Sequence, residues 1–226
     1  MSLSNVPITL IVAATKKNGI GKNGGLPWPM LKKEMAYFAR VTKRVPLPTN
    51  TGSLQSDTLK QTLLVGQRQN VVVMGRKTWE SIPPRLRPLK DRTNIVISSQ
   101  TKDQLNISAD GVIVASSILS GLQELERMVK QGEALPVGRT FVIGGTTIYR
   151  AALQLPQTQS ILLTRIEKDF DCDTTFPIDL EAAEGWQRST RPDLERFVGE
   201  DIPEGRLSEG QKEDEVQYEF QLYEKL

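Results

Sequence analysis

Short apolar runs rich in β-branched residues alternate along the chain with turn residues and helical patterns. The runs occupy residues 8–14, 71–74, 94–97, 112–115, 141–143 and 161–166. Their apolar positions are continuous rather than alternating, which is typical of strands buried on both faces. Helical patterns follow at residues 31–41, around Trp79, and at residues 119–130 and 148–153. This order predicts an α/β fold with a mostly parallel central sheet flanked by helices.

The end of the chain and two polar stretches depart from this pattern. Residues 216–223 alternate between mainly apolar and mainly polar positions, which predicts a half-exposed antiparallel strand that closes the sheet. Residues 42–70 and 188–215 are rich in polar residues, glycine and proline. We expect both to be long loops inserted into a single domain that spans residues 1–226.

Composition limits the chemistry that the chain can perform. It has no histidine, and Cys172 is its single cysteine. This excludes histidine-activated nucleophiles and an intrachain disulfide, argues against a zinc or other metal site, and fits a reducing compartment such as the cytoplasm. The net charge of +2 argues against a nucleic-acid partner, and the longest apolar run is too short to span a membrane.

An acidic residue occupies the apolar face of the first predicted helix. At about 100° per residue the apolar side chains form one stripe, which consists of Leu31, Met35, Phe38 and Val41. Glu34 falls inside this stripe. Burying an ionisable acid costs free energy unless it is paired, and we find no permanent partner nearby in the sequence. We therefore expect Glu34 to meet a ligand that presents hydrogen-bond donors, and Met35 and Phe38 to face either the core or a pocket.

Three strand ends carry residues that suit a phosphate. Residues 75–78 (Gly-Arg-Lys-Thr) and 144–147 (Gly-Gly-Thr-Thr) each join a strand to a helix, and Ser98 and Ser99 end a third strand. Helix N-termini attract anions, and glycine lets a phosphate approach the backbone closely. Each junction alone is also compatible with an ordinary turn or cap. Together, at the strand ends where open α/β sheets bind ligands, they indicate an extended dinucleotide, and Arg76 indicates an extra 2′-phosphate.

Residues 19–24 match the pattern G-x-G-x-x-G but do not open a helix, because Pro27 and Pro29 follow. A glycine loop that covers a ligand is the better interpretation. Two further residues have two interpretations each. Arg92 could bind a ligand carboxylate through two hydrogen bonds or form a surface ion pair with Asp91. Trp28 could belong to the core or line a pocket.

Together these residues resemble the dihydrofolate reductase family. The matching segments occur in the family's order and cover well over half of the chain: IVAATKKNGIGKNGGLPWP, the helix with Glu34 and Phe38, VVVMGRKTWESIP, RPLKDRTNIVIS, FVIGGTTIY, LLTRIEKDFDCDTTFP and YEFQLYEK. No single motif decides the resemblance, but the ordered set is specific. The polar stretch after the first helix, and Met35 where vertebrate members carry an aromatic residue, resemble the fungal members.

The resemblance implies an oxidoreductase of tetrahydrofolate biosynthesis that reduces 7,8-dihydrofolate with NADPH. It implies a hydride transfer to pterin C6 and protonation at N5. The catalytic residues would be Glu34, Trp28 and Thr164. Residues that match substrate-binding positions are Ile11, Val12, Met35, Phe38, Ile82, Leu86, Leu89, Arg92, Ile143 and Tyr149. Residues that match cofactor-binding positions are Ala13, Ile20, Gly21, Gly24, Gly25, Leu26, Gly75, Arg76, Lys77, Thr78, Ser98, Ser99, Gln100, Gly144, Gly145, Thr146, Thr147 and Ile148.

The resemblance also implies a cytoplasmic monomer that takes part in one-carbon metabolism and binds antifolates. The Gly144-Gly145 pair matches a pair that is joined by a cis peptide in the family. Ser99 stands where many members carry an arginine for the 2′-phosphate, so Arg76 would have to make that contact. Two alternatives remain at this point: a pyrimidine reductase of riboflavin synthesis, which shares the fold, and a non-catalytic protein that binds nucleotides or pterins.

Overall fold

The computed structural model describes residues 3–46, 67–211 and 214–226. The strands are β1 (Ile8–Thr15), β2 (Gly19–Gly21), β3 (Gln69–Gly75), β4 (Arg92–Ile97), β5 (Val112–Ala115), β6 (Val137–Val142), β7 (Thr158–Ile166), β8 (Thr174–Thr175), β9 (Trp186–Arg188), β10 (Leu207–Glu209) and β11 (Val216–Lys225). The helices are α1 (Lys32–Lys43), α3 (Arg76–Ser81), α4 (Ile118–Lys130), α5 (Thr146–Leu153) and α6 (Arg191–Val198), with short 3₁₀ turns at Leu3–Asn5 and Pro84–Leu86.

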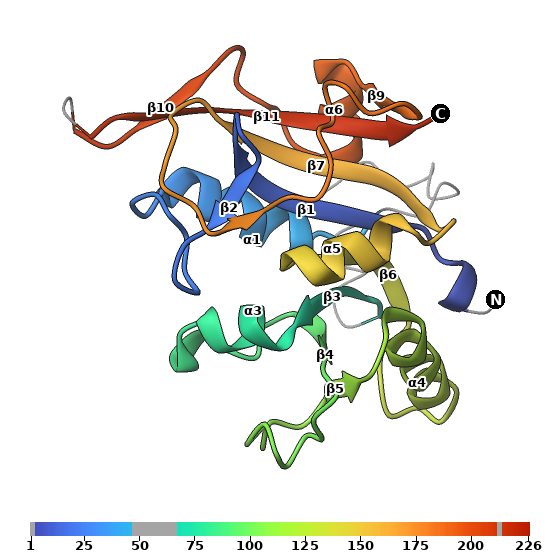
Figure 1. The fold of residues 1–226 in the computed structure, drawn as a ribbon. Helices are drawn as coiled ribbons and strands as arrows, with labels where there is room; N and C mark the ends of the chain where they lie inside the picture. Colours follow the sequence, from blue (N-terminus) through green and yellow to red (C-terminus); the bar gives the residue numbers. More distant parts are fainter. Residues whose placement is uncertain (1–2, 47–66, 212–213) are drawn as a thin grey trace.

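One large sheet organises the described residues, in the strand order β10-β11-β7-β1-β6-β3-β4-β5 (Figure 1). The strands from β7 to β5 in this order are parallel to one another. The C-terminal strand β11 is antiparallel to β7, and both β10 and β9 pair with β11 in antiparallel fashion. These pairings confirm the mostly parallel sheet with an antiparallel closing strand. The small strands β2 and β8 form a separate pair.

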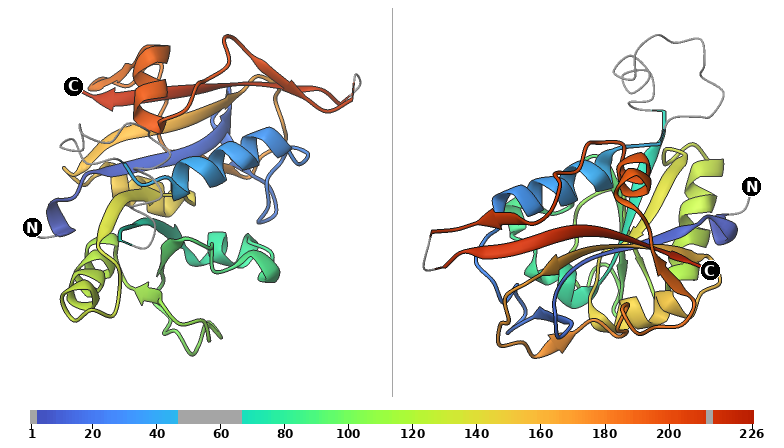
Figure 2. Two further views of the ribbon diagram at one scale, coloured as in Figure 1. Left: turned by 180° about the vertical axis from the view of Figure 1, so that it is seen from behind. Right: turned by 90° about the horizontal axis from the view of Figure 1, so that it is seen from above.

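Helices cover both faces of the sheet, and the two apolar clusters follow this division. One cluster joins the sheet to α4 and α5, for example through Leu122 and Tyr149. The other joins it to α1, α3 and α6, for example through Val41, Trp79 and Leu194. Figure 2 shows α1 on the side opposite α5. None of the helices in the described part of the chain is long and apolar enough to cross a bilayer.

Two predictions about the C-terminal part are corrected by the structure. The stretch 188–215 is not a plain loop, because it contains α6 and β10. Thr190 caps α6 by accepting a hydrogen bond from the Asp193 backbone N–H, and Gly199 ends the helix in the left-handed conformation. The strand β11 is half-exposed only over its first half, since Gln221 and Tyr223 are both buried. Most of the other polar stretch, 42–70, lies outside the described residues, although its ends belong to α1 and β3.

A buried asparagine ties the C-terminal end of α1 to the sheet. Asn70 Nδ2 donates to the carbonyl oxygens of Thr42 and Arg44, at 3.0 and 2.8 Å. Asn70 Oδ1 accepts a hydrogen bond from the Arg139 backbone N–H at 2.8 Å. Gly138 allows this close approach, because a Cβ atom there would lie 2.4 Å from Asn70 Oδ1. The hydrogen bonds of Asn70 therefore fix the position of α1 relative to β3 and β6.

Replacing Asn70 with alanine should lower the free energy of unfolding by about 2–4 kcal/mol, because two buried carbonyls and one N–H lose their partner. Urea unfolding followed by circular dichroism measures this change. Asn5→Ala removes the same side chain from an exposed site and should change stability little. Equal stabilities of the two variants would contradict the role given to Asn70.

Candidate active site

The Glu34 carboxyl lies in the first turn of α1 and is buried, with 8% of the residue exposed. The sheet supplies its hydrogen bond, since Thr164 Oγ1 of β7 donates to Glu34 Oε1 at 3.2 Å. Thr164 is itself 2% exposed. Among the described residues no lysine or arginine forms an ion pair with Glu34. The stripe of apolar residues thus correctly predicted that Glu34 is buried, and the partner that the structure adds, Thr164, is neutral.

Burial raises the pKa of Glu34 to about 7, because the charged form loses its hydration. The hydrogen bond from Thr164 opposes this rise, and the negative charge of Glu209 adds to it. A group with this pKa exchanges protons readily near neutral pH, as a general acid or base should. Since the chain has no histidine, Glu34 can serve in the role that a histidine often fills.

An arginine from the sheet contacts the C-terminal end of α1. Arg92 is the first residue of β4 and is buried, with 8% exposed. Its Nη1 donates to Thr42 Oγ1 at 2.8 Å, and its Nε donates to the Lys90 carbonyl at 3.0 Å. The alternative of an ion pair with Asp91 is wrong, because Asp91 pairs with Lys43 Nζ at 3.0 Å. Glu34 and Thr42 are eight residues apart, so the acid and the arginine lie about 12 Å apart along α1.

The face of α1 between these two ends differs in part from the predicted stripe. Tyr37, which was not predicted, is buried and stacks on Phe220 with ring centroids 3.8 Å apart. Phe38 is partly buried. Met35 is 43% exposed, so the first of its two interpretations, the core, is wrong, and a place in the wall of a pocket stays a prediction. The 3.6-residue period sends Glu34, Tyr37 and Val41 toward the sheet, and Met35 lies beside them where nothing covers it.

Other predicted substrate-binding residues divide between the two faces of the sheet. Those in the same apolar cluster as Trp28 and Leu31 are Ile11, Phe38, Ile82, Leu89 and Ile143. Val12 and Tyr149 belong to the cluster on the opposite face. Tyr149 nevertheless reaches β1, because its hydroxyl donates to the Ile11 carbonyl at 2.7 Å. Leu86 is 51% exposed. Trp28 is buried and packs against Phe170 in a T-shaped arrangement, with ring centroids 6.0 Å apart.

Close packing joins the ends of β3 and β6. The Gly75 N–H donates to the Gly144 carbonyl at 2.8 Å, and a Cβ atom on Gly75 would lie 2.9 Å from Ile148 Cγ1. Gly144 has a φ of 121° and is joined to Gly145 by a cis peptide bond. Neither α3 nor α5 has a side-chain cap, whereas Ser117 caps α4. Two helix N-termini with unused N–H groups therefore meet at one place, which is an arrangement suited to phosphates.

The C-terminal end of β4 lies beside the end of β3. Gly75 is aligned with Ile97 across the β3–β4 pair, so Ser98 follows directly beside the glycine. Ser98, Ser99 and Gln100 line a depression of about 730 Å³ together with residues of β5 and residues along α4. Arg76 Nη1 forms an ion pair with Glu80 Oε1 at 2.9 Å. The Thr146 hydroxyl donates to the Thr175 carbonyl at 2.6 Å and is already used in holding β8.

The glycine-rich segment 19–25 forms a small hairpin. Lys22 and Gly25 exchange backbone hydrogen bonds of 3.0 and 2.9 Å around a turn at Asn23 and Gly24. The Asn23 N–H donates to Asp173 Oδ2 at 2.8 Å. Cys172 packs over Gly19, where a Cβ atom would lie 2.4 Å from its Sγ. Burial and the neighbouring Asp171 and Asp173 raise the pKa of the Cys172 thiol, which argues against a nucleophile.

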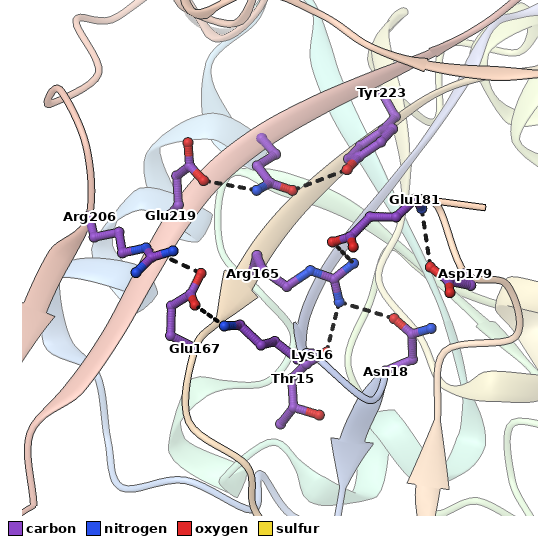
Figure 3. A network of polar contacts seen from close by, with 11 residues as sticks. Thr15, Lys16, Asn18, Arg165, Glu167, Asp179, Glu181, Arg206, Glu219 and Tyr223 are labelled. Atoms are coloured by element: carbon purple, nitrogen blue, oxygen red, sulfur yellow. Dashed lines mark hydrogen bonds and ion pairs between the residues drawn. The ribbon is translucent and has the colours of Figure 1, made fainter. Parts of the chain in front are cut away.

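A buried arginine, not identified from the sequence, holds the base of this hairpin (Figure 3). Arg165 Nη1 donates to the Thr15 carbonyl at 2.7 Å and to Asn18 Oδ1 at 3.0 Å. Its Nη2 lies 3.6 Å from Glu181 Oε1. Asn18 adopts a left-handed conformation with a φ of 60°. The guanidinium therefore fixes the turn from which β2 starts.

Comparisons with known proteins agree on one family. A family model described as dihydrofolate reductase matches residues 65–196. The dihydrofolate reductase of Pneumocystis carinii is 39% identical, over 96% of this chain and 95% of its own length. That of Schizosaccharomyces pombe is 37% identical over 96% of this chain, which spans 46% of that protein. The solved structure of Schistosoma mansoni dihydrofolate reductase has a TM-score of 0.70 and 30% identity, and covers 98% of this chain and 100% of its own.

The chain belongs to the dihydrofolate reductase family. The resemblance to this family found in the sequence is thereby confirmed. The comparisons do not favour the pyrimidine reductase alternative.

Four residues around the site of this family member were missed in the sequence. Tyr37 and Phe170 were not singled out because each is an isolated aromatic residue. Arg165 did have a signal, since it interrupts the apolar run 161–166. Glu209 had none, because the backbone groups that it contacts, at residues 33 and 34, lie far away in the chain.

The raised pKa of Glu34 should make the stability of the protein fall as pH rises. The folded-state pKa of about 7 exceeds the ordinary value of 4.5, so the folded state binds more protons between these values. The free energy of unfolding should therefore decrease from about pH 4.5 to about pH 7. The Glu34→Gln variant should not lose stability in this pH range. At pH 8 we expect its free energy of unfolding to exceed that of the parent by roughly 1–3 kcal/mol.

Urea unfolding at pH 4, 6 and 8 measures this difference, which should vanish at pH 4. The control Glu133→Gln makes the same change at an exposed position. Its stability should follow that of the parent at every pH. A Glu34→Gln curve parallel to the parent curve would show that Glu34 has an ordinary pKa in the folded protein.

Proposed function

We infer that the protein catalyses the NADPH-dependent reduction of 7,8-dihydrofolate to 5,6,7,8-tetrahydrofolate. The observation that carries this conclusion is the placement of a buried acid and a buried arginine at the two ends of α1. Dihydrofolate has a flat pterin with N–H donors at one end and carboxylates at the other. Glu34 can accept hydrogen bonds from the pterin, and Arg92 can bind a carboxylate. The apolar residues between them can pack against the ring that joins these two ends of the ligand.

The residues at the strand ends fit the cofactor NADPH. Gly144 and Gly145 leave space that a side chain would fill, since a Cβ on either would lie within 3.6 Å of Thr78 Oγ1. We propose that the N–H groups at the starts of α3 and α5 bind the pyrophosphate, and that Arg76, Lys77, Ser98 and Ser99 surround the 2′-phosphate. When bound, NADPH supplies the hydride. Gly19–Gly21 and the turn that follows would cover it.

The side chains of the chain itself supply orientation and the proton. We propose that ionised Glu34 accepts hydrogen bonds from the 2-amino and N3 positions of the pterin, while Thr164 keeps the carboxyl in place. Because its pKa lies near 7, the same carboxyl can take up a proton from solvent and pass it through a water held near Trp28 to pterin N5. Apolar walls keep other water away from the two rings, so that orientation provides much of the rate enhancement.

We further propose a cytoplasmic monomer in which the chain forms a single domain. Strands from both ends of the chain lie in one sheet, which supports the single domain. The lone, half-buried Cys172 suits a reducing compartment. Inhibitors that carry the same donor edge as the pterin should bind between Glu34 and Phe38.

Purified protein mixed with NADPH and dihydrofolate should show a substrate-dependent loss of nicotinamide absorbance. Glu34→Gln should retain the fold but lose at least about 100-fold in the rate of hydride transfer at pH 7, because it cannot carry the proton. Stopped-flow absorbance under single-turnover conditions measures this rate. Glu133→Gln, an exposed position, should keep the parent rate. Binding of both ligands without any decay of NADPH would favour a non-catalytic binding protein.

Arg92→Gln should weaken binding of dihydrofolate by about 10- to 100-fold, because a charge-assisted pair with the ligand carboxylate is lost. A pterin without the glutamate tail should bind the variant and the parent equally well. Fluorescence titration with both ligands measures these affinities, and Arg85→Gln is a control at an exposed position on the neighbouring turn. An equal loss for both ligands would mean that Arg92 only holds Thr42 and the end of α1.

A further inference from the structure

The first turn of α1 is capped by a carboxylate from a distant part of the chain. The residue before the helix, Leu31, offers no side-chain cap. Instead, both carboxylate oxygens of Glu209, at the end of β10, accept hydrogen bonds from the Lys33 N–H at 3.0 Å. Glu209 Oε1 also accepts one from the Glu34 N–H at 3.3 Å. The segment 188–215, which had no assigned role, thus contacts the backbone of the acid at the centre of the site.

Glu209 is held firmly and is ionised. Tyr218 of β11 donates its hydroxyl to Glu209 Oε1, and the β10–β11 pair aligns Glu209 with Val216. Burial alone would raise the pKa of Glu209. Hydrogen bonds from Tyr218 and from the backbone of residues 32–34 outweigh this effect, and the pKa lies below its ordinary value. At neutral pH a full negative charge therefore stands at the start of α1.

Several groups from different elements face Glu34, and they differ in charge. Thr164 of β7 is neutral. The tyrosines that interact electrostatically with Glu34 are Tyr37 of α1 itself, Tyr149 of α5 and Tyr218 of β11. Burial raises the pKa of all three, so they are neutral near pH 7. Among these described groups, Glu209 alone carries a charge, and it acts against ionisation of Glu34.

We propose that Glu209 is a positioning residue for Glu34, which fixes the first turn of α1 and places a permanent negative charge beside the carboxyl that handles the proton. The inference deepens the proposed function and rests on it. An uncapped helix N-terminus would favour a negative charge in its first turn, and would therefore make Glu34 a weaker proton carrier. The carboxylate of Glu209 occupies these N–H groups and cancels that influence.

Three variants of Glu209 separate the charge from the cap. Glu209→Gln keeps the size and an acceptor oxygen but removes the charge. Glu209→Asp keeps the charge on a shorter side chain. Glu209→Ala removes both. Thr190→Ala is the matched control, since it removes a helix cap in the same segment, at α6, away from Glu34.

The titration of Glu34 is followed directly by ¹³C NMR of protein labelled at the glutamate δ-carbons, with Glu34 assigned by its absence in Glu34→Gln. We expect the midpoint to fall by about half a pH unit or more in Glu209→Gln and Glu209→Ala. It should stay near the parent value in Glu209→Asp and Thr190→Ala. The pH profile of single-turnover hydride transfer should move in the same direction, which is about a threefold lower rate for Glu209→Gln at pH 8.

A midpoint in Glu209→Gln within about 0.1 unit of the parent would overturn the proposal, and so would equal shifts in Glu209→Gln and Glu209→Asp. Either result would leave Glu209 as a structural cap, comparable to Thr190 at α6. Loss of such a cap should lower the melting temperature without moving the titration of Glu34. The NMR measurement needs no turnover. If the parent does not oxidise NADPH with dihydrofolate, the proposed function fails, while the titration still decides the role of Glu209.

Discussion

The Glu34 carboxyl is buried beside a neutral hydroxyl, and the chain holds it there from several directions. Glu209 fixes the start of α1, and Asn70 and Arg92 fix its end. Burying an acid in this way costs stability. The helix therefore needs anchors at both ends that do not neutralise the carboxyl, and the anchors found are backbone and hydroxyl contacts rather than a cation beside Glu34. The burial that makes the group costly also brings its pKa to about 7.

The second constraint is the contact between the ends of β3 and β6. Gly75 and Gly144 approach closely enough for a backbone hydrogen bond, and Ile148 fills the space that a side chain on Gly75 would need. This contact brings the starts of α3 and α5 together. Both strands also belong to the sheet that carries Thr164, so the proposed phosphate-binding residues and the buried acid are fixed on one sheet.

Local patterns in the sequence predicted what depends on local physics. The apolar runs gave the parallel strands, because burial on both faces leaves a continuous pattern. The period of α1 identified Glu34, and the glycines marked the strand ends. Long-range contacts were not predictable in the same way. The cap at Glu209 joins residues 176 positions apart. Whether Met35 faces the core or a pocket also stayed open, because periodicity gives the face of a helix but not what covers it. The helix α6 was missed although Thr190, Pro192 and Gly199 provide its start and stop signals.

The absence of histidine gives the raised pKa of Glu34 a further consequence. In most proteins several imidazoles exchange protons with the buffer around neutrality. Here that background does not exist, and among the residues that the structure describes Glu34 has a pKa of about 7. Calorimetry of ligand binding in buffers with different ionisation enthalpies would thus report the proton exchange of Glu34 and of the ligand itself without a contribution from imidazoles.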